Sequence, residues 1–568
     1  MDSTDILKKY WGHTKFRFNQ HEIIEQVLTK NDTLAILPTG GGKSICYQIP
    51  ALMQEGLCIV ISPLISLMND QIKHLQSKGI KSVSITGNMQ YFEIDTALNN
   101  CIYGGVKFLY LSPERLNNNL IEERIKMMKI NLIAVDEAHC ISEWGHNFRP
   151  SYRKISRIRE ITKETTILAL TATATNNVIK DIQENLLFKQ ENLIKSSLFR
   201  SNISYIVESF KDKEPRLLKI LNRIKSSTIV YVGTRKKAKD LTNFLIKNKL
   251  SASYYHAGLS INDKNKRQIE WNKNNIRIMV ATNAFGMGID KKDVKLIVHM
   301  DLPSSIESYF QEAGRAGRND KPAYAYLLAN SSDILRQEQF LELKYPTIDE
   351  IVTVYQKIAS YLHISIGELP ENPIPFDIEK FSKKYNMKIL KIYNTLKYLE
   401  KENKLKLIEE KYSPSMVKII TSNTNLYKFQ ITNKYYDSFI KLLLRSYSNI
   451  FNHLVIINEE KIAENLNISI QNVKKIFVKL QQLEIINYQE QNNLSKLKFL
   501  QNRQELNRNH LNKKKWNERK ESERKKLKSI TNYIGNKEIC RSQQLLNYFG
   551  EILSEQCMQC DVCIKRNN

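Results

Sequence analysis

The stretch Ile130-Asn-Leu-Ile-Ala-Val-Asp-Glu-Ala-His139 decides how this chain folds. Its first six residues form an apolar run of the length expected for a buried β-strand, and two acidic residues follow directly. About ninety residues earlier, a second apolar run from Thr33 to Leu37 leads into Pro38-Thr-Gly-Gly-Gly-Lys-Ser44 and then into a helical pattern. A strand, a glycine-rich loop and a helix, followed by a strand that ends in Asp-Glu, predict a nucleoside triphosphate site.

The glycine-rich loop has the residue types that bind phosphate. Glycines permit backbone angles that point successive N–H groups at phosphate oxygens, and the following helix adds its positive N-terminus. A lysine can reach the β- and γ-phosphates, and a serine hydroxyl can face Mg²⁺. Because Leu37 stands where the strict pattern has its first glycine, a glycine-rich turn before a lysine is the alternative. The residues predicted to bind ATP here are Thr39, Gly40, Gly41, Gly42, Lys43 and Ser44.

The acidic segment supplies the remaining chemistry of such a site. Asp136, at a strand end, can hold the metal through water together with Ser44, and Glu137 can polarise the attacking water. An isolated Asp-Glu-Ala-His sequence could be an exposed acidic turn. Its spacing after a phosphate loop favours the catalytic interpretation.

Length and composition set limits on the rest. The chain has 568 residues, which predicts three or four domains, and its 42% hydrophobic fraction is sufficient to fold them. The net charge of +27 favours a polyanionic partner, although a Lys/Asn/Ile-rich composition could inflate the charge by itself. No run approaches the roughly twenty apolar residues of a membrane span, and Met1-Asp2-Ser3 does not begin a signal peptide. We therefore expect a cytoplasmic protein without a membrane partner.

Strand-like and helical segments alternate through the first 335 residues. Apolar runs such as Leu57 to Ile61 and Ile167 to Leu170 predict one α/β domain over residues 1–200, and the pattern restarts for a second over 201–335. This alternation predicts two parallel sheets with helices on both faces and ligands at the carboxyl ends of the strands. Two such lobes form a cleft.

The sequence after residue 340 becomes helical and lysine-rich. Two stretches, 378–407 and 460–488, each predict a helix, a short turn, a longer helix and a strand. This order of elements is typical of a winged helix, so residues 340–505 are predicted to be a winged-helix-like region of one or two units. We expect this region to contact duplex DNA. Plain helical packing is the alternative. Residues 501–528 predict a charged helix that is either a solvated face or a phosphate contact.

The loop that follows the Asp-Glu-Ala-His segment interleaves aromatic rings and cations. Such interleaving suits stacking on single-stranded bases, and the neighbouring Pro, Gly and polar residues favour a loop over a buried core. Buried aromatic side chains are the alternative. The residues predicted to sense DNA are Trp144, His146, Phe148, Arg149 and Tyr152.

The eight cysteines fall into two groups. Cys46, Cys58, Cys101 and Cys140 lie in apolar or motif segments and are expected to be buried thiols. The other four lie in the last 29 residues with metal-ligand spacing, and they are Cys540, Cys557, Cys560 and Cys563.

Together these motifs resemble the RecQ family of superfamily 2 DNA helicases, over residues 1–335 and again over 520–563. The resemblance implies two RecA-like lobes, a winged-helix-like region and a C-terminal helix with a zinc-binding segment at 510–568. Four thiolates suit a closed, structural Zn²⁺ site, and an iron–sulfur cluster is the minority alternative. Family members usually place the zinc segment directly after the second lobe, whereas some two hundred residues intervene here. This departure leaves open where a strand-separating wing lies.

The resemblance also implies roles for further residues. Arg17 and Gln20 are similar to the adenine-reading motif, and Ser62 and Asn69 belong to a segment that holds strand phosphates. The segment 169–174 links hydrolysis to movement, and His139 takes part in that coupling. The residues similar to the arginine-finger set, which stabilises charge on the transferred phosphoryl group, are Gln311, Arg315 and Arg318.

The resemblance implies an ATP-, Mg²⁺- and Zn²⁺-dependent DNA helicase that moves 3′ to 5′ and acts in recombination, replication and repair. The expected partners of such a helicase are single-stranded, duplex and branched DNA. The resemblance is also compatible with binding to single-strand-binding protein and other repair factors, and with association with a bacterial nucleoid. A DEAH-box RNA helicase and a nucleic-acid-binding scaffold without hydrolysis are the alternatives. The first is disfavoured by the aromatic loop and the zinc signature, and the second by the full set of catalytic residues.

Overall fold

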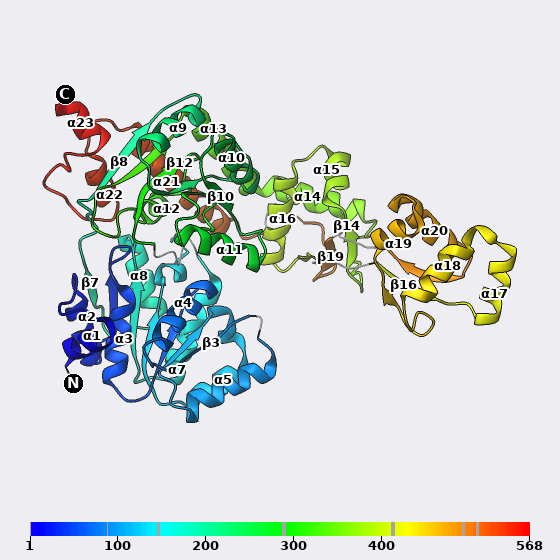
Figure 1. The fold of residues 1–568 in the computed structure, drawn as a ribbon, viewed down its shortest axis with the longest axis horizontal. Helices are drawn as coiled ribbons and strands as arrows, with labels where there is room; N and C mark the ends of the chain where they lie inside the picture. The colour runs from blue at the N-terminus through cyan, green and yellow to red at the C-terminus, as the bar shows by residue number, and fades with distance from the viewer. Residues whose placement is uncertain are drawn as a thin grey trace. The chain divides into compact units, whose positions relative to one another are not determined.

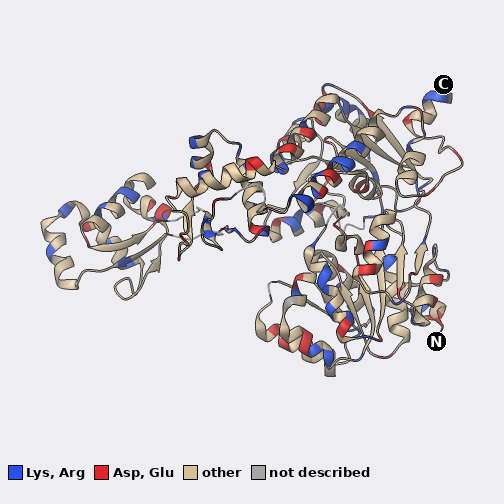
Figure 2. Cartoon of the chain, turned by 180° about the vertical axis from the view of Figure 1, so that it is seen from behind, with Lys and Arg blue, Asp and Glu red and all other residues tan. Residues whose placement is uncertain are grey.

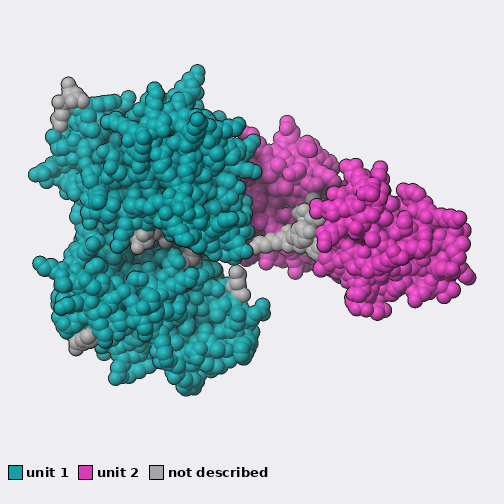
Figure 3. Space-filling model, viewed as in Figure 1, with its two compact units in different colours: residues 1–339, 521–568 teal, residues 340–520 magenta. Residues whose placement is uncertain are grey.

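The computed structural model describes residues 2–567, except 88, 144, 146–147, 287–290, 410–414, 491–494 and 507–510. The chain separates into two compact units (Figure 3): residues 1–339 with 521–568 form unit 1, and residues 340–520 form unit 2. None of the described helices is long and apolar enough to cross a bilayer.

Unit 1 begins with a seven-stranded parallel sheet (Figure 1) in the order β3-β4-β2-β5-β6-β1-β7. Its central strands are mostly apolar because alternate side chains enter two different cores, Leu34 and Ile36 on one face and Ala35 and Leu37 on the other. The strands are β1 Thr33–Ile36, β2 Leu57–Ile61, β3 Ser82–Ile85, β4 Phe108–Leu111, β5 Ile130–Val135, β6 Thr166–Thr171 and β7 Leu193–Lys195. The α-helices are α1 Ser3–Trp11, α2 Gln20–Leu28, α3 Lys43–Met53, α4 Ile65–Gln76, α5 Tyr91–Tyr103, α6 Asn119–Lys126, α7 Ile155–Ile161 and α8 Asn176–Asn185, with 3₁₀ turns η1 Pro113–Asn117, η2 Ala138–Ile141 and η3 Pro150–Lys154.

The second lobe of unit 1 is a six-stranded parallel sheet in the order β10-β11-β9-β12-β13-β8. Its strands are β8 Ile203–Glu208, β9 Ser227–Tyr231, β10 Ala252–Tyr255, β11 Ile278–Ala281, β12 Val294–His299 and β13 Ala323–Leu328. Its helices are α9 Lys213–Arg223, α10 Arg235–Lys247, α11 Ile261–Asn272, α12 Ile306–Ala313 and α13 Ser331–Lys344. The predicted pair of α/β lobes is confirmed.

Unit 2 contains two similar helix–helix–strand segments, as the sequence predicts. The first is α15 Ile378–Tyr385, α16 Ile389–Lys401 and β15 Leu405–Ile408, and the second is α19 Glu459–Leu466, α20 Ile470–Gln482 and β18 Ile486–Gln489. The remaining elements are α14 Ile348–Tyr361, β14 Ile374–Phe376, β16 Met416–Ile419, α17 Asn423–Thr432, α18 Lys434–Ser446, β17 Val455–Ile456 and β19 Ser495–Phe499.

The second sheet of unit 2 is inserted in sequence between two strands of the first. Strand β16 follows β15 in the chain but joins the sheet β17-β16-β18, and β19 follows β18 but joins the sheet β14-β19-β15. Among the described residues, neither β15 with β16 nor β18 with β19 therefore forms the paired hairpin that builds a wing.

The chain returns to unit 1 through α21 Lys513–Gly535, α22 Arg541–Tyr548 and α23 Asp561–Asn567. The charged helix predicted over 501–528 thus begins and ends later than expected. Its buried positions continue past residue 528 to Ile530 and Tyr533, which join the same core as the strands of the first lobe. Phe549 also joins this core, so the fold brings the zinc segment back to unit 1 although unit 2 precedes it in sequence.

Candidate active site and zinc centre

The phosphate loop lies between β1 and α3. Gly40 and Gly42 have φ values of 81° and 73°, in the left-handed region that glycine tolerates best. The Gln20 side-chain amide donates to the carbonyl oxygens of Gly41 at 3.0 Å and Gly42 at 3.1 Å. A Cβ on Gly42 would lie 2.5 Å from Gln20 Nε2 and would displace that amide, and the positive φ of Gly42 disfavours any side chain there. Arg17 is exposed, and its backbone N–H donates to Gln20 Oε1 at 2.9 Å.

The acidic pair lies at the carboxyl end of β5. The N–H of Asp136 donates to the Ile61 carbonyl at 2.9 Å, and the N–H of Glu137 donates to Asp136 Oδ1 at 2.9 Å. Burial and the neighbouring Glu137 carboxylate raise the pKa of Asp136 to about 6, although Lys43 opposes them. Two carboxylates in a buried place repel each other, and a divalent cation relieves that repulsion. Asp136 therefore fits Mg²⁺, and Ser44 lies in the first turn of α3, directly after the phosphate loop.

Residues of the second lobe meet the phosphate loop. The Thr39 hydroxyl donates to the Gly314 carbonyl at 3.0 Å, and Arg318 Cγ lies 3.4 Å from the position that a Cβ on Gly40 would take. The Gln311 amide donates to the Thr173 hydroxyl, in the segment after β6, at 3.2 Å. Arg315 is buried in the second lobe. Gln311 and Arg318 of the predicted finger set thus contact the first lobe.

Arg200 is a contact residue that sequence reasoning missed. It lies between β7 and β8, and its guanidinium donates to the carbonyl oxygens of Thr39 at 3.4 Å and Gly317 at 2.7 Å. One side chain therefore joins the phosphate loop to the loop that carries Arg318. No motif marks this arginine in the sequence, because its partners are backbone oxygens far away along the chain.

The coupling residues after β5 form a second cluster. His139 Nδ1 lies 3.3 Å from Glu137 Oε2 and 3.0 Å from the Thr171 hydroxyl. The Arg149 guanidinium donates to the Pro63 carbonyl at 3.0 Å, and the Phe148 ring lies 5.2 Å from the Arg153 guanidinium carbon. Of the other predicted residues, Asn69 is exposed on α4, whereas Trp144 and His146 lie outside the described residues.

Two residues predicted to contact DNA are buried instead of exposed. The Tyr152 ring has 0% exposure and its hydroxyl donates to the Asp136 carbonyl at 2.9 Å, so it supports the acidic strand end and cannot stack on a base. Ser62 is also buried, and its hydroxyl faces Asp136 Oδ2 at 3.5 Å. Aromatic spacing in a loop does not distinguish an exposed ring from one that the core covers.

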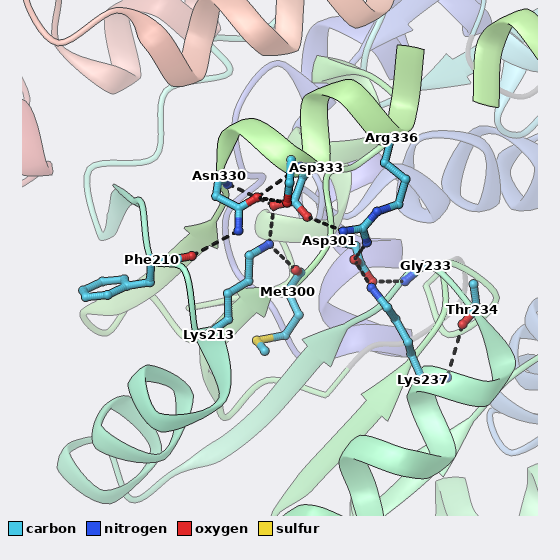
Figure 4. Close-up of polar contacts among 11 residues, drawn as sticks. Phe210, Lys213, Gly233, Thr234, Lys237, Met300, Asp301, Asn330, Asp333 and Arg336 are labelled. Carbon is cyan, nitrogen blue, oxygen red and sulfur yellow. Dashed lines mark hydrogen bonds and ion pairs between the residues drawn. The ribbon is translucent and has the colours of Figure 1, made fainter. Parts of the chain in front are cut away.

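A polar network orders the carboxyl ends of β9 and β12 (Figure 4). Lys213 pairs with Asp333 at 2.5 Å, and Lys237 pairs with Asp301 at 2.5 Å. Asp301 also accepts the N–H of Gly233 at 2.8 Å. The network lines a cavity of about 620 Å³. Since these lysines already face carboxylates, the network fits a structural role at the start of α10.

The four C-terminal cysteines converge. Their sulfur atoms all lie within 4.8 Å of one another, and tetrahedral Zn²⁺ with Zn–S bonds of about 2.3 Å requires separations of roughly 3.8 Å. Hydrogen bonds from the Cys557 and Cys560 thiols lower the pKa of Cys540, which favours a thiolate ligand. The backbone N–H of Arg541 donates to Cys560 Sγ at 3.4 Å. The donor set therefore fits a closed Zn²⁺ site.

The zinc segment contacts both the linker between the lobes and α12. The Gln559 amide donates to the Ser201 carbonyl at 2.6 Å, and Lys195 donates to the Phe549 carbonyl at 2.7 Å. The Tyr548 hydroxyl donates to Glu307 on α12 at 2.8 Å. Since α12 also carries Gln311, the zinc segment buttresses the helix that reaches the ATP site.

Comparisons with known proteins agree with this arrangement. The DEAD/DEAH box helicase model matches residues 17–182 and the helicase conserved C-terminal domain matches 212–320. The RecQ helicase winged-helix domain of Bacteroidota matches 417–490, and the RecQ zinc-binding model matches 492–564. RecS of Bacillus subtilis (strain 168), named a probable ATP-dependent DNA helicase, is 40% identical over 353 residues, which cover 61% of this chain and 71% of RecS. The chain belongs to the RecQ family.

Two further comparisons concern a RecQ helicase and a solved structure that shares only the fold. ATP-dependent DNA helicase RecQ of Pasteurella multocida (strain Pm70) is 42% identical over 330 residues, 58% of this chain. The match spans only 52% of the length of that relative. A crystal structure of the DUF1998 helicase MrfA bound to DNA shares the fold with a TM-score of 0.52 and 19% identity, over 71% of this chain and 61% of MrfA.

Proposed function

We propose that this RecQ-family chain is an ATP-dependent DNA helicase that moves 3′ to 5′ along a single strand and unwinds intermediates of recombination, replication and repair. The observation that carries the proposal is the ATP site built across two lobes. Arg318 lies against Gly40, and the Gln311 amide donates a hydrogen bond to the Thr173 hydroxyl. A change at the phosphates can therefore alter contacts between the two lobes.

The residues of this site divide the chemistry of hydrolysis. Gln20 and Arg17 read the adenine base, and Lys43 neutralises charge on the β- and γ-phosphates. Mg²⁺, when bound by Ser44 and Asp136, supplies further positive charge at the phosphates. Glu137 orients the attacking water and accepts its proton.

The second lobe supplies the groups that make hydrolysis depend on closure of the lobes. Arg318 stabilises the charge that develops on the transferred phosphoryl group, with Arg315 and Gln311 beside it. When the phosphate leaves, Arg318 loses its anionic partner and the lobes separate.

Binding of single-stranded DNA influences the catalytic water through a short series of side-chain contacts. Trp144, His146, Phe148 and Arg149 stack on or hold the single strand, and Asn69 contacts its backbone. His139 links that loop to both Glu137 and Thr171, so its position depends on the strand and controls the general base.

Each segment of the chain then has its own task. Residues 1–200 and 201–335 form the motor, 340–505 bind duplex DNA through the winged-helix-like region, and 510–568 hold the motor lobes together through zinc. The excess of basic residues favours a location at the nucleoid in the cytoplasm, where branched DNA, single-strand-binding protein and other repair factors are its partners.

Strand displacement with tailed duplexes tests the proposal. DNA duplexes with a 3′ tail, DNA duplexes with a 5′ tail and 3′-tailed RNA duplexes are compared in the presence of ATP and Mg²⁺. The 3′-tailed DNA should be unwound far faster than the other two. Preference for RNA would establish the DEAH-box RNA helicase alternative, and absence of DNA-stimulated ATPase activity would leave only a binding scaffold.

A further inference from the structure

The hairpin formed by α17 and α18 presents large apolar side chains to solvent. Tyr427 and Tyr435 are 67% and 75% exposed, and Ile431 is 60% exposed. Tyr427 and Ile431 lie one turn apart on α17 and therefore share one face of that helix. The hairpin itself is anchored, because Leu426, Phe439 and neighbouring side chains enter the core of the second sheet of unit 2.

Aromatic rings lie side by side where α17 meets α18. The Phe429 and Tyr436 rings are stacked, with centroids 5.9 Å apart and planes inclined by 27°. The Tyr435 ring lies edge-on to Tyr436 with centroids 5.0 Å apart. A perpendicular neighbour covers at most one face of the exposed Tyr435 ring, so at least one face is available to a flat partner.

Charge around these rings is strongly one-sided. Between residues 416 and 458 there is a single acidic residue, Asp437, against five basic ones, whereas the whole chain has 59 acidic and 86 basic residues. Asp437 is already paired with Lys441 at 2.8 Å. Figure 2 shows basic residues along this part of the chain, which Figure 1 places at α17 and α18. The basic residues are Lys418, Lys428, Lys434, Lys441 and Arg445.

We propose that the α17–α18 hairpin is a second binding surface for single-stranded DNA, on which Tyr427 and Tyr435 stack bases while Lys428 and Lys434 contact phosphates. Single strands expose the faces of their bases, so a partly exposed tyrosine can stack on any of them. Duplex DNA hides those faces, and an acidic protein would match the charge but not the rings. The inference rests on the proposed function, since a helicase produces the single strands that this surface binds.

Photochemical crosslinking of the full-length chain tests the surface directly. A poly-deoxythymidine strand that contains 5-iododeoxyuridine is bound without ATP, irradiated and mapped by peptide mass spectrometry. We expect crosslinks on Tyr427 or Tyr435 in addition to those on the motor lobes. Since no hydrolysis is involved, an inactive motor would not remove these crosslinks, and failure of the proposed function would be recognised separately by strand displacement.

Affinity measurements on variants complete the test. Tyr427→Ala with Tyr435→Ala should weaken single-strand binding at least about fivefold, the lower end of what one stacked base contributes. Tyr103→Ala is the matched control, because Tyr103 is 76% exposed on α5 of the first lobe and should change nothing. Lys428→Gln and Lys434→Gln should each reduce the slope of log affinity against log salt by about 0.7. Crosslinks confined to the motor lobes together with unchanged affinity of the double tyrosine variant would overturn the proposal.

Discussion

Glu137 is held in place by its backbone as well as by its neighbours. Its φ of 49° is uncommon for a residue with a side chain, and such a conformation persists only where the surroundings maintain it. Here the N–H of Glu137 bonds Asp136 and its carboxylate faces His139. The side chain that we propose to activate water is thereby positioned before any substrate binds.

Substitutions at the ATP site should separate binding from turnover. Lys43→Ala and Glu137→Gln should each lower the ATPase rate by at least about a hundredfold, since one removes phosphate neutralisation and the other the general base. Glu137→Gln should still bind ATP, because the amide keeps the shape of the carboxylate. Single-turnover hydrolysis and nucleotide binding by a fluorescent ATP analogue measure the two effects. Near-normal rates in both variants would refute the catalytic assignment.

Lys526, like Arg200, makes a contact that only the tertiary structure reveals. It is buried on α21, and its ammonium donates to the carbonyl of Gly145 at 2.9 Å, in the middle of the aromatic loop. A Cβ on Gly145 would lie 2.5 Å from the His139 carbonyl, so this part of the loop packs closely on the backbone of His139. Lys526 therefore positions the loop from the side of α21.

Removal of this contact should weaken the response to DNA. Lys526→Ala should raise the single-strand concentration needed for half-maximal ATPase activity by about tenfold, the effect of one charged hydrogen bond, with a smaller change in the maximal rate. Lys525→Ala is the control, since its side chain is exposed on the same helix. An equal response in the two variants would show that Lys526 does not position the loop.

At the scale of elements, one sheet of unit 2 is nested within the other in sequence. Leu497 on β19 is buried and lies opposite both Ile374 and Leu407 of the first sheet, although β19 follows β18 of the second in the chain. The second sheet is built from the continuous stretch 416–489, and the buried side chains of its core all come from that stretch. Only the first sheet therefore depends on a strand that returns across the insertion.

Leu497→Ala should therefore loosen the first sheet of unit 2. The cavity should cost about 2 to 5 kcal/mol of the free energy of unfolding of that sheet and the helices on it. Hydrogen exchange should then rise in β14, β15 and β19 and change much less in β16 and β18, whose core comes from residues 417–488. Lys498→Ala, an exposed neighbour on the same strand, should leave exchange unchanged. An equal rise in β16 and β18 would show that the two sheets unfold together.

The zinc segment should fold only with its metal. Four sulfurs this close are stable as ligands but not as four thiolates alone, so metal binding and local folding are coupled. Cys560→Ser should reduce the zinc content from about one atom per chain and expose the C-terminal region to proteolysis. Cys101→Ser, which removes a buried thiol of the first lobe, should do neither. Elemental analysis of protein purified without chelator measures the content, and an absence of metal there would eliminate the site.

At the scale of the whole molecule, unit 2 is an insertion into unit 1. Its two ends lie together, because the Trp516 indole donates to the Pro346 carbonyl at 2.9 Å and Lys520 pairs with Glu342 at 2.6 Å. An insertion with adjacent ends can be removed without stretching the chain that remains.

Replacement of residues 347–511 by a short Gly/Ser linker should preserve the motor. Duplex affinity should fall, since the cationic helices of unit 2 are lost, while ATPase activity stimulated by short single strands should change much less. The same chain with an equal linker inserted after residue 346 is the control for the linker itself. Equal duplex affinity with and without the segment, at one salt concentration, would show that unit 2 is a spacer.

Local patterns in the sequence were sufficient to predict the motor lobes and the converging zinc cysteines, and they supplied the residues proposed to bind the nucleotide. The glycines of the phosphate loop satisfy a requirement of backbone geometry. The carboxylates at the end of β5 and the closely spaced C-terminal cysteines satisfy requirements of coordination chemistry. Such requirements act over a few neighbouring residues, so they can be recognised without the fold.

Tertiary structure alone decided the burial of Tyr152, the contacts of Arg200 and Lys526, the pairing of β19 with β14 and β15, and the return of the zinc segment to unit 1. Each of these depends on partners that are far apart in the chain. Arg200 and Lys526 bind backbone carbonyl oxygens. Because every residue has such an oxygen, the sequence does not indicate which residue is the partner. Strand β19 has an alternating pattern that suits either sheet, and only packing of the complete unit selects one.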